Sequence, residues 1–225
     1  MKKLFCIFAC LFLFSSLSFA TLNIEEVNAF DRPFMNPYSK TLDYAGTGFE
    51  IASVLSPCFL FNTPAQDYWK IGVEYAETMV LAFGAKELAK LCVDRARPYM
   101  YFDGAPESEI AKGDHLNSFF SGHTTLSFAA AGFTTYHALK YYSNDNWYKW
   151  VAIGTSYTLC TTTAILRLAS GNHFMTDVLT GAAVGTAIGF FVPWVNHFWF
   201  KHTYPLPENV EAVVTPLSLN VKISL

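Results

Sequence analysis

Charge is scarce in this sequence. Only 15% of its 225 residues are Asp, Glu, Lys or Arg, and the formal net charge is −3. No basic run is present, whereas a protein that binds a nucleic-acid backbone needs a stripe of Lys and Arg. We therefore expect no nucleic-acid partner.

Cysteine is also scarce, and its spacing is uninformative. Beyond residue 20 only Cys58, Cys92 and Cys160 remain, an odd number that leaves at least one thiol free. No Cys and His residues have the spacing of metal ligands. We predict a protein with no metal and no cofactor.

Apolar residues are abundant by contrast, at 52% of the sequence, and they fall into five stretches. The stretches cover residues 44–62, 71–92, 119–142, 150–168 and 178–200. Each is close to the roughly 20 residues that cross a bilayer as a helix. The last is the strongest candidate, because it carries no charge and its Gly181, Gly185 and Gly189 allow close helix packing. The first two are weaker, because Glu50 and Glu74 would be costly in lipid.

The stretches predict an all-α fold, a helical bundle of five to six helices embedded in a membrane. A long external loop joins the second and third helices. The C-terminal tail has the alternation of a short strand, with Leu219, Val221 and Ile223 separated by polar residues. A soluble exported bundle is the alternative.

The first 20 residues resemble a signal peptide. Lys2 and Lys3 precede a short apolar run, and Ser18 and Ala20 are suitably small for cleavage. An uncleaved anchor is the alternative. We predict a signal peptide at 1–20, an external segment at 21–43, a helical-bundle domain at 44–204 and a tail at 205–225. The protein would be exported to a membrane of the cell envelope.

The first of three polar clusters is Lys90 with Arg97-Pro98. Lys90 ends the second apolar stretch, and Pro98 stops any continuing helix. The two cations can converge on one anion, since Arg grips phosphate oxygens with two hydrogen bonds and Lys supplies a point charge. Taken without the other clusters, Lys90 and Arg97 would be interpreted as ordinary cations at the membrane interface.

The second cluster, Ser121-Gly122-His123, opens the third stretch. Free N–H groups at a helix N-terminus attract anions, and glycine lets the backbone come close. Ser121 would cap the helix and donate to a phosphate. His123 can donate a proton to a departing alkoxide. A Ser-Gly turn is also a common simple cap.

The third cluster contains Arg167, His173 and Asp177. The spacing of four residues places His173 and Asp177 on one helical turn, so the carboxylate can hold one ring nitrogen and orient the other outward. The imidazole would then be free to attack phosphorus.

An exported start would bring these clusters together. If the chain begins outside and all five stretches cross the membrane, residues 90–118 and 171–176 both lie on the outer face. Lys70, Lys140, Lys149 and Lys201 then lie near the inner ends, as the positive-inside tendency prefers. The site would face the periplasm or exterior.

The pattern of Lys, six residues, Arg-Pro, then Ser-Gly-His, then Arg, five residues, His, three residues, Asp resembles the type 2 phosphatidic acid phosphatase family, which shares its core with vanadium haloperoxidases. Two positions depart from the family: Phe120 replaces a usual Pro, and Leu166 a frequent Ser. Neither departure removes a reactive group.

The resemblance implies a role for each residue. His173 would form a phosphohistidine, Asp177 would orient it, and His123 would protonate the leaving oxygen and then activate water. Lys90, Arg97, Arg167, Ser121 and Gly122 would bind the phosphoryl oxygens. Cations then neutralise the charge that a metal otherwise would.

The residues leave the substrate open. A lipid phosphate is expected, either an isoprenyl pyrophosphate, a phosphatidyl phosphate or a lipid A phosphate. The alternatives are a soluble exported acid phosphatase acting on small phosphomonoesters, a vanadate-dependent haloperoxidase and a non-catalytic membrane protein. No oligomeric state is predicted.

Overall fold

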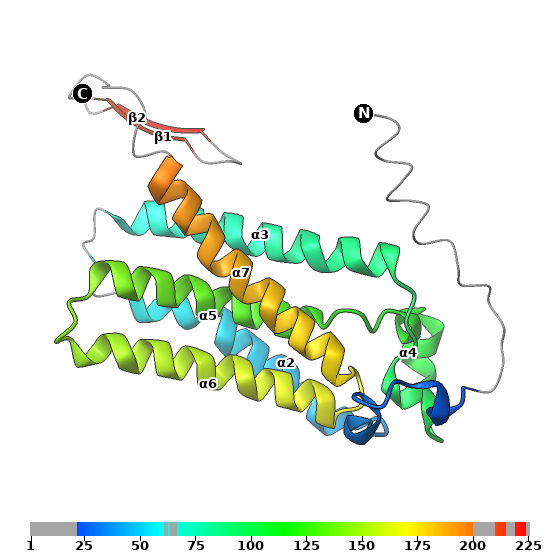
Figure 1. The fold of residues 1–225 in the computed structure, drawn as a ribbon. Coiled ribbons are helices and arrows are strands. Elements are labelled where there is room, and N and C mark those ends of the chain that lie inside the picture. Colours follow the sequence, from blue (N-terminus) through cyan, green and yellow to red (C-terminus); the bar gives the residue numbers. More distant parts are fainter. Residues whose placement is uncertain (1–21, 61–62, 64–66, 200–209, 215–218, 224–225) are drawn as a thin grey trace, which may run out of the picture.

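The computed structural model describes residues 22–60, 63, 67–199, 210–214 and 219–223. The predicted signal peptide at 1–20 lies outside these residues. The described part is predominantly helical, with long helices aligned side by side (Figure 1). The predicted all-α bundle is therefore confirmed.

Five long helices correspond to the five apolar stretches. They are α2 Lys40–Val54, α3 Tyr68–Cys92, α5 Gly122–Tyr141, α6 Trp147–Ala169 and α7 Met175–Trp199. Their bounds differ from the predicted stretches by a few residues, except that the first stretch breaks. There α2 ends before Pro57, and a 3-10 turn, η3 Ser56–Leu60, follows. The predicted domain start at residue 44 falls inside α2.

Side-chain caps explain where two helices begin. Ser121 precedes α5 and accepts a hydrogen bond from the Thr124 amide, and Asn146 precedes α6 and accepts one from Tyr148. The predicted capping role of Ser121 is confirmed.

The predicted loop between the second and third stretches folds against one end of the bundle. It contains η5 Pro98–Tyr101, the short helix α4 Glu107–Ala111 and η6 Asp114–Leu116. The N-terminal segment, with η1 Ile24–Glu26 and η2 Arg32–Phe34, lies at the same end (Figure 1). The loop and this segment together enclose the helix ends that carry the three clusters.

Helix α5 is the centre of the bundle and packs against α2, α3, α6 and α7. Its contact with α7 depends on glycine: a Cβ atom at Gly181 would lie 2.7 Å from the carbonyl oxygen of Ser121, and Gly185 and Gly189 face the backbone of α5 as closely. The prediction that these glycines allow close helix packing is confirmed.

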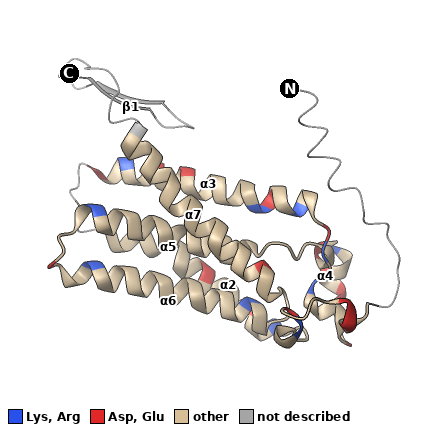
Figure 2. Ribbon diagram, in the orientation of Figure 1, with Lys and Arg blue, Asp and Glu red and all other residues tan. Residues whose placement is uncertain are grey.

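The bundle buries many small polar residues beside its apolar core, and many large apolar residues lie on its surface. Its interior includes Thr78, Thr124, Ser127, Thr134 and Thr163, all fully buried. Its surface includes Val80, Leu88, Trp150, Ile165 and Phe191, each more than half exposed. Charged residues gather at helix ends and around α4 and are sparse along the helix middles (Figure 2). A surface of this kind is poorly suited to water.

Among the described residues, α7 from Met175 to Phe198 is the one helix that is long and apolar enough to cross a membrane, judged by length and composition alone. The last stretch is thus confirmed as the strongest candidate. The other four predicted spans do not reach the same standard, because charged and hydroxyl side chains interrupt them.

The predicted C-terminal strand is present and its partner is the segment just before it. Strands β1 Val210–Val214 and β2 Leu219–Ile223 pair antiparallel, with Ala212 opposite Val221.

Candidate active site

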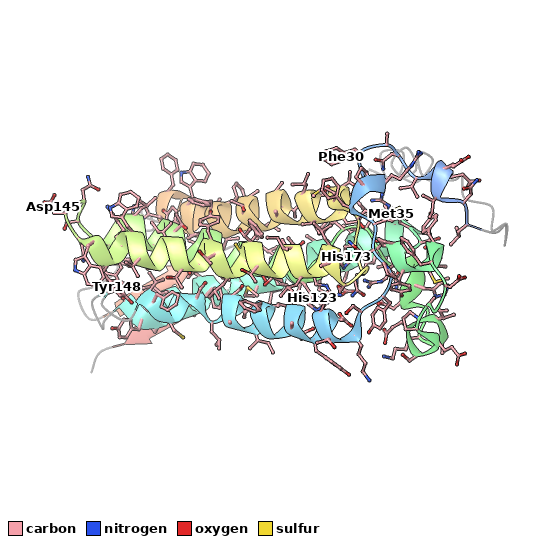
Figure 3. The ribbon with its side chains drawn as sticks, turned by 90° about the horizontal axis from the view of Figure 1, so that it is seen from below. Phe30, Met35, His123, Asp145, Tyr148 and His173 are labelled. Atoms are coloured by element: carbon pink, nitrogen blue, oxygen red, sulfur yellow. The ribbon has the colours of Figure 1, made fainter. Side chains whose placement is uncertain are left out.

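The three clusters converge on one cavity of about 340 Å³ at the end of the bundle. Its lining includes six of the predicted site residues: Lys90, Arg97, Gly122, His123, Arg167 and His173. His123 and His173 both lie at the end of the bundle opposite Asp145 and Tyr148 (Figure 3). The other two predicted residues, Ser121 and Asp177, are fully buried behind the cavity wall.

The two arginines are already paired with carboxylates. Arg97 donates from Nη2 to Asp114 at 2.6 Å, and Arg167 forms an ion pair with Asp43. Both guanidinium groups are almost completely buried. Burial alone would raise the pKa of Asp114, but the charge and hydrogen bond of Arg97 outweigh it and hold the pKa below its usual value. These pairs fix the arginines at the cavity.

Lys90 differs from the arginines. It lies in the last turn of α3 and lines the cavity, and among the described residues no ion pair of Lys90 is seen. Its charge is therefore available to an incoming anion, whereas the arginines share theirs with carboxylates.

Gly122 makes room for a lysine that the sequence motifs did not single out. A Cβ atom at Gly122 would lie 2.7 Å from Cδ of Lys86, one turn before Lys90 on α3. Lys86 also lines the cavity and forms an ion pair with Glu87. A side chain at position 122 would displace this fourth cation.

His123 lies on the open side of the cavity. Its Nε2 atom is 3.4 Å from both Thr47 Oγ1 and Glu50 Oε2, and its side chain is 32% exposed. The ring can therefore meet both a substrate and water.

His173 is held in one tautomer. Its Nδ1 atom is 2.8 Å from the carbonyl oxygen of Ser118, and because a carbonyl can only accept, Nδ1 carries the proton. The lone pair is then on Nε2, which accepts a hydrogen bond from Nη1 of Arg97 at 3.3 Å. Burial lowers the pKa of His173 to about 4, and the charges of Arg97 and Arg167 add to this effect while Asp177 opposes it. The imidazole is therefore neutral at neutral pH.

Asp177 does not bind His173 directly, which differs from the expected geometry. Its Oδ2 atom is 3.8 Å from His173 Nδ1, but it accepts from Ser118 Oγ at 2.6 Å and from the Phe174 amide at 2.9 Å. The Ser118 carbonyl is closer to the ring and accepts the hydrogen bond from Nδ1. The hydrogen bonds of Asp177 therefore reach His173 through Ser118, while its charge acts on the ring directly.

Sequence reasoning missed several residues of the site. Asp43, Glu50 and Lys86 carry charge within or beside apolar stretches, and that cost was the signal that could have found them. Ser118 gave no signal, because its role depends on its backbone carbonyl. No three His, Cys, Asp or Glu side chains in the described part of the chain are grouped as metal ligands.

The fold and the cavity define a helical bundle with a cation-lined anion site at one end. The family model of the PAP2 superfamily matches residues 71–201, more than half of the chain, and the protein belongs to this superfamily.

Relatives and a solved structure resemble the chain over most of its length. The lipid A 1-phosphatase of Porphyromonas gingivalis is 30% identical over 167 residues, covering 72% of this chain and 33% of that protein. A PA-phosphatase related-family protein of Dictyostelium discoideum is 26% identical over 145 residues, covering 62% of this chain and 53% of that protein. The chain thus spans about a third and a half of these relatives.

The fold matches that of a transmembrane PAP2-type phosphatidylglycerolphosphate phosphatase from Bacillus subtilis. The TM-score is 0.51 at 20% identity, over 90% of this chain and 98% of the other. At this identity the likeness concerns the fold.

Proposed function

We propose that this protein is a metal-independent phosphatase that hydrolyses a phosphate monoester or pyrophosphate of a membrane lipid through a phosphohistidine intermediate. One observation carries the proposal: His173 is neutral, and the lone pair on its Nε2 atom accepts a hydrogen bond from Arg97 at a cavity lined by further cations. A lone pair held next to positive charge is the arrangement that attack on a phosphoryl group requires.

The reaction has two displacements. In the first, the His173 Nε2 lone pair attacks phosphorus, the N–P bond forms, and the bond to the leaving oxygen breaks as His123 gives that oxygen a proton. In the second, His123 takes a proton from water, the hydroxide attacks phosphorus, and the N–P bond breaks to release phosphate. His123 ends protonated and His173 ends with its lone pair restored.

The cations stabilise the phosphoryl oxygens in both steps. Lys90 interacts with the phosphoryl oxygens as a point charge, while Arg97 and Arg167 are held in place by Asp114 and Asp43. Because these groups are fixed before the substrate arrives, little reorganisation is needed as charge develops. Ser121 is buried behind the cavity wall and holds the turn that carries Gly122 and His123, so we assign it an indirect role in phosphate binding.

A membrane location is supported by the exterior of the bundle. Large apolar side chains such as Val80, Ile165 and Phe191 are exposed around it, while polar residues are buried. This distribution favours the membrane-embedded enzyme over the soluble acid phosphatase. The cavity is at the end where α3 finishes and α5 begins, which an exported start would place on the periplasmic or outer side.

The substrate class follows from the site and its surroundings. A phosphate at the end of a lipid-facing bundle would be part of a headgroup, and candidates are an isoprenyl pyrophosphate, a phosphatidyl phosphate or a lipid A phosphate. The similar Porphyromonas gingivalis protein is named for the last of these.

The test is phosphate release by the purified full-length protein in detergent, over lipid and soluble phosphoesters, with and without chelator. The proposal predicts release from at least one lipid phosphate, no effect of chelator, and an acid-labile, base-stable phosphoenzyme that is absent from His173→Ala. Activity only on soluble esters, or activity that leaves the membrane fraction with an alkaline wash, would contradict the lipid assignment.

A further inference from the structure

A second layer of charged residues lies behind His173, on the side away from the cavity. It joins the N-terminal segment to the start of α7 through Asp31, Arg95 and Asp177. Phe30 and Met35 of that segment lie at the same end of the bundle as His173 (Figure 3). Neither Asp31 nor Arg95 belongs to the three sequence clusters.

Asp31 is a fully buried carboxylate that accepts most of its hydrogen bonds from Arg95 and Thr176. It accepts from Arg95 Nη2 at 2.7 Å, from the Thr176 amide at 2.8 Å and from Thr176 Oγ1 at 2.7 Å. Asn28 donates to it as well, at 2.7 Å. Burial alone would raise the pKa of Asp31, but these hydrogen bonds hold it below its usual value, so the carboxylate is ionised.

Arg95 joins this carboxylate to the catalytic residues. Its Nη1 atom pairs with Asp177 and donates to Thr176 Oγ1 at 2.8 Å, and its guanidinium lies 4.1 Å from the centre of the Phe174 ring. The fork of an arginine side chain can hold two carboxylates in a fixed geometry, which a lysine cannot.

Ser118 is the link from Arg95 to the nucleophile. Its amide donates to the Arg95 carbonyl at 3.0 Å, and its hydroxyl donates to Asp177. Arg95 thus constrains Ser118 twice, through its own backbone and through Asp177. The Ser118 carbonyl then accepts a hydrogen bond from Nδ1 of His173, which leaves the lone pair of the ring on Nε2.

We propose that Asp31 and Arg95 are positioning residues for the nucleophile: Asp31 fixes the Arg95 guanidinium, and Arg95 fixes Asp177 and Ser118 so that Nε2 of His173 faces the cavity. The N-terminal segment is then part of the catalytic apparatus although it does not line the cavity. The inference rests on the proposed function, in which His173 attacks phosphorus.

If Asp31 and Arg95 position the nucleophile, substituting them should lower kcat with little change in KM, because the cations that bind the phosphate are unchanged. A nucleophile displaced by an ångström can lose about a hundredfold in rate. We expect Arg95→Met to lower kcat about 100-fold, Arg95→Lys to restore only part of it, and Asp31→Asn to lower kcat about tenfold. KM should stay within about threefold of the wild-type value, because binding and attack are separate here.

The experiment measures kcat, KM and thermal unfolding on the full chain in detergent, with the best lipid phosphate from the substrate screen. Arg32→Met is the matched control, because within the described part of the chain the Arg32 side chain donates only to the backbone carbonyls of Glu25 and Val27 in the same segment. It should leave kcat unchanged. The double variant Asp31→Asn with Arg95→Met should lose no more than Arg95→Met alone, because both act through one chain of contacts.

The outcomes separate this inference from the proposed function. If the wild type is active and Asp31→Asn and Arg95→Lys both keep its kcat, or lose activity through KM alone, the positioning role is wrong and the phosphatase stands. Additive losses in the double variant would also overturn it. If Asp31→Asn does not fold, Arg95→Lys provides the same comparison of kcat with KM. An inactive wild type would overturn the proposed function first.

Discussion

The two histidines of the cavity have opposite surroundings. His173 is 2% exposed and its Nδ1 atom is fixed at 2.8 Å from a carbonyl, whereas His123 is 32% exposed and has only contacts of 3.4 Å. The first lies in a rigid network between the loop and α7, and the second projects from the first turn of α5 toward α2. A nucleophile needs one tautomer and one direction of attack, while a proton carrier must meet both the leaving group and water.

The strongest test of this contrast removes the nucleophile. We expect His173→Ala to lower phosphate release by at least about 10⁴-fold, because no other group can form the covalent intermediate. Phosphate release from the lipid substrate measures the effect, and circular dichroism with thermal unfolding checks the fold. Substantial residual activity would show that another group attacks phosphorus.

Removing the proton carrier should have a smaller effect that depends on the substrate. We expect His123→Ala to lower kcat by about 10²- to 10⁴-fold on an alkyl phosphate, whose alkoxide leaving group needs a proton. With p-nitrophenyl phosphate, whose leaving group is stable as an anion, the first displacement, measured as the burst of p-nitrophenol, should be slowed much less. Equal losses in the first displacement on the two substrates, compared in one preparation, would contradict the role of His123 as proton donor.

Much of this architecture could be predicted from the sequence, and particular residues show why the rest could not. The five helices and the glycine contacts of α7 follow from local apolar runs and four-residue spacing. The convergence of Lys90, His123 and His173 followed from the order of the helices. Asp31 and Ser118 could not be found, because their roles depend on contacts over 145 and 55 residues along the chain.

The low pKa of His173 extends activity to acid pH. An ordinary imidazole, with a pKa near 6.5, would be mostly protonated at pH 5 and would have no lone pair for attack. Because burial lowers the pKa of His173 to about 4, the nucleophile stays neutral down to that pH. We expect kcat/KM to fall about tenfold per pH unit only below pH about 4.

A pH profile of kcat/KM, with the stability of the fold checked at each pH, measures where activity begins to fall. A fall that begins near pH 6.5 would mean that His173 is more exposed to water than the network allows. Loss of activity on the alkaline side is also expected, because His123 must be protonated for the first step, so the full profile should be bell-shaped.

The smallest effect should come from the loose surroundings of His123. Glu50 is 3.4 Å from Nε2, and its side chain is 17% exposed. A carboxylate at that distance stabilises the protonated imidazole, but partial exposure limits the interaction. We therefore expect Glu50→Gln to lower kcat only about threefold, far less than Arg95→Met on the other side of the cavity.

Thr47→Val is the matched control for this variant, because Thr47 contacts the same nitrogen at 3.4 Å without a charge. It should lower kcat less than Glu50→Gln does, since only the carboxylate favours the imidazolium. If Glu50→Gln instead lost as much activity as His123→Ala, the contrast between the histidines would be wrong. His123 would then need a fixed carboxylate partner as strictly as His173 needs Ser118, and both sides of the cavity would be rigid.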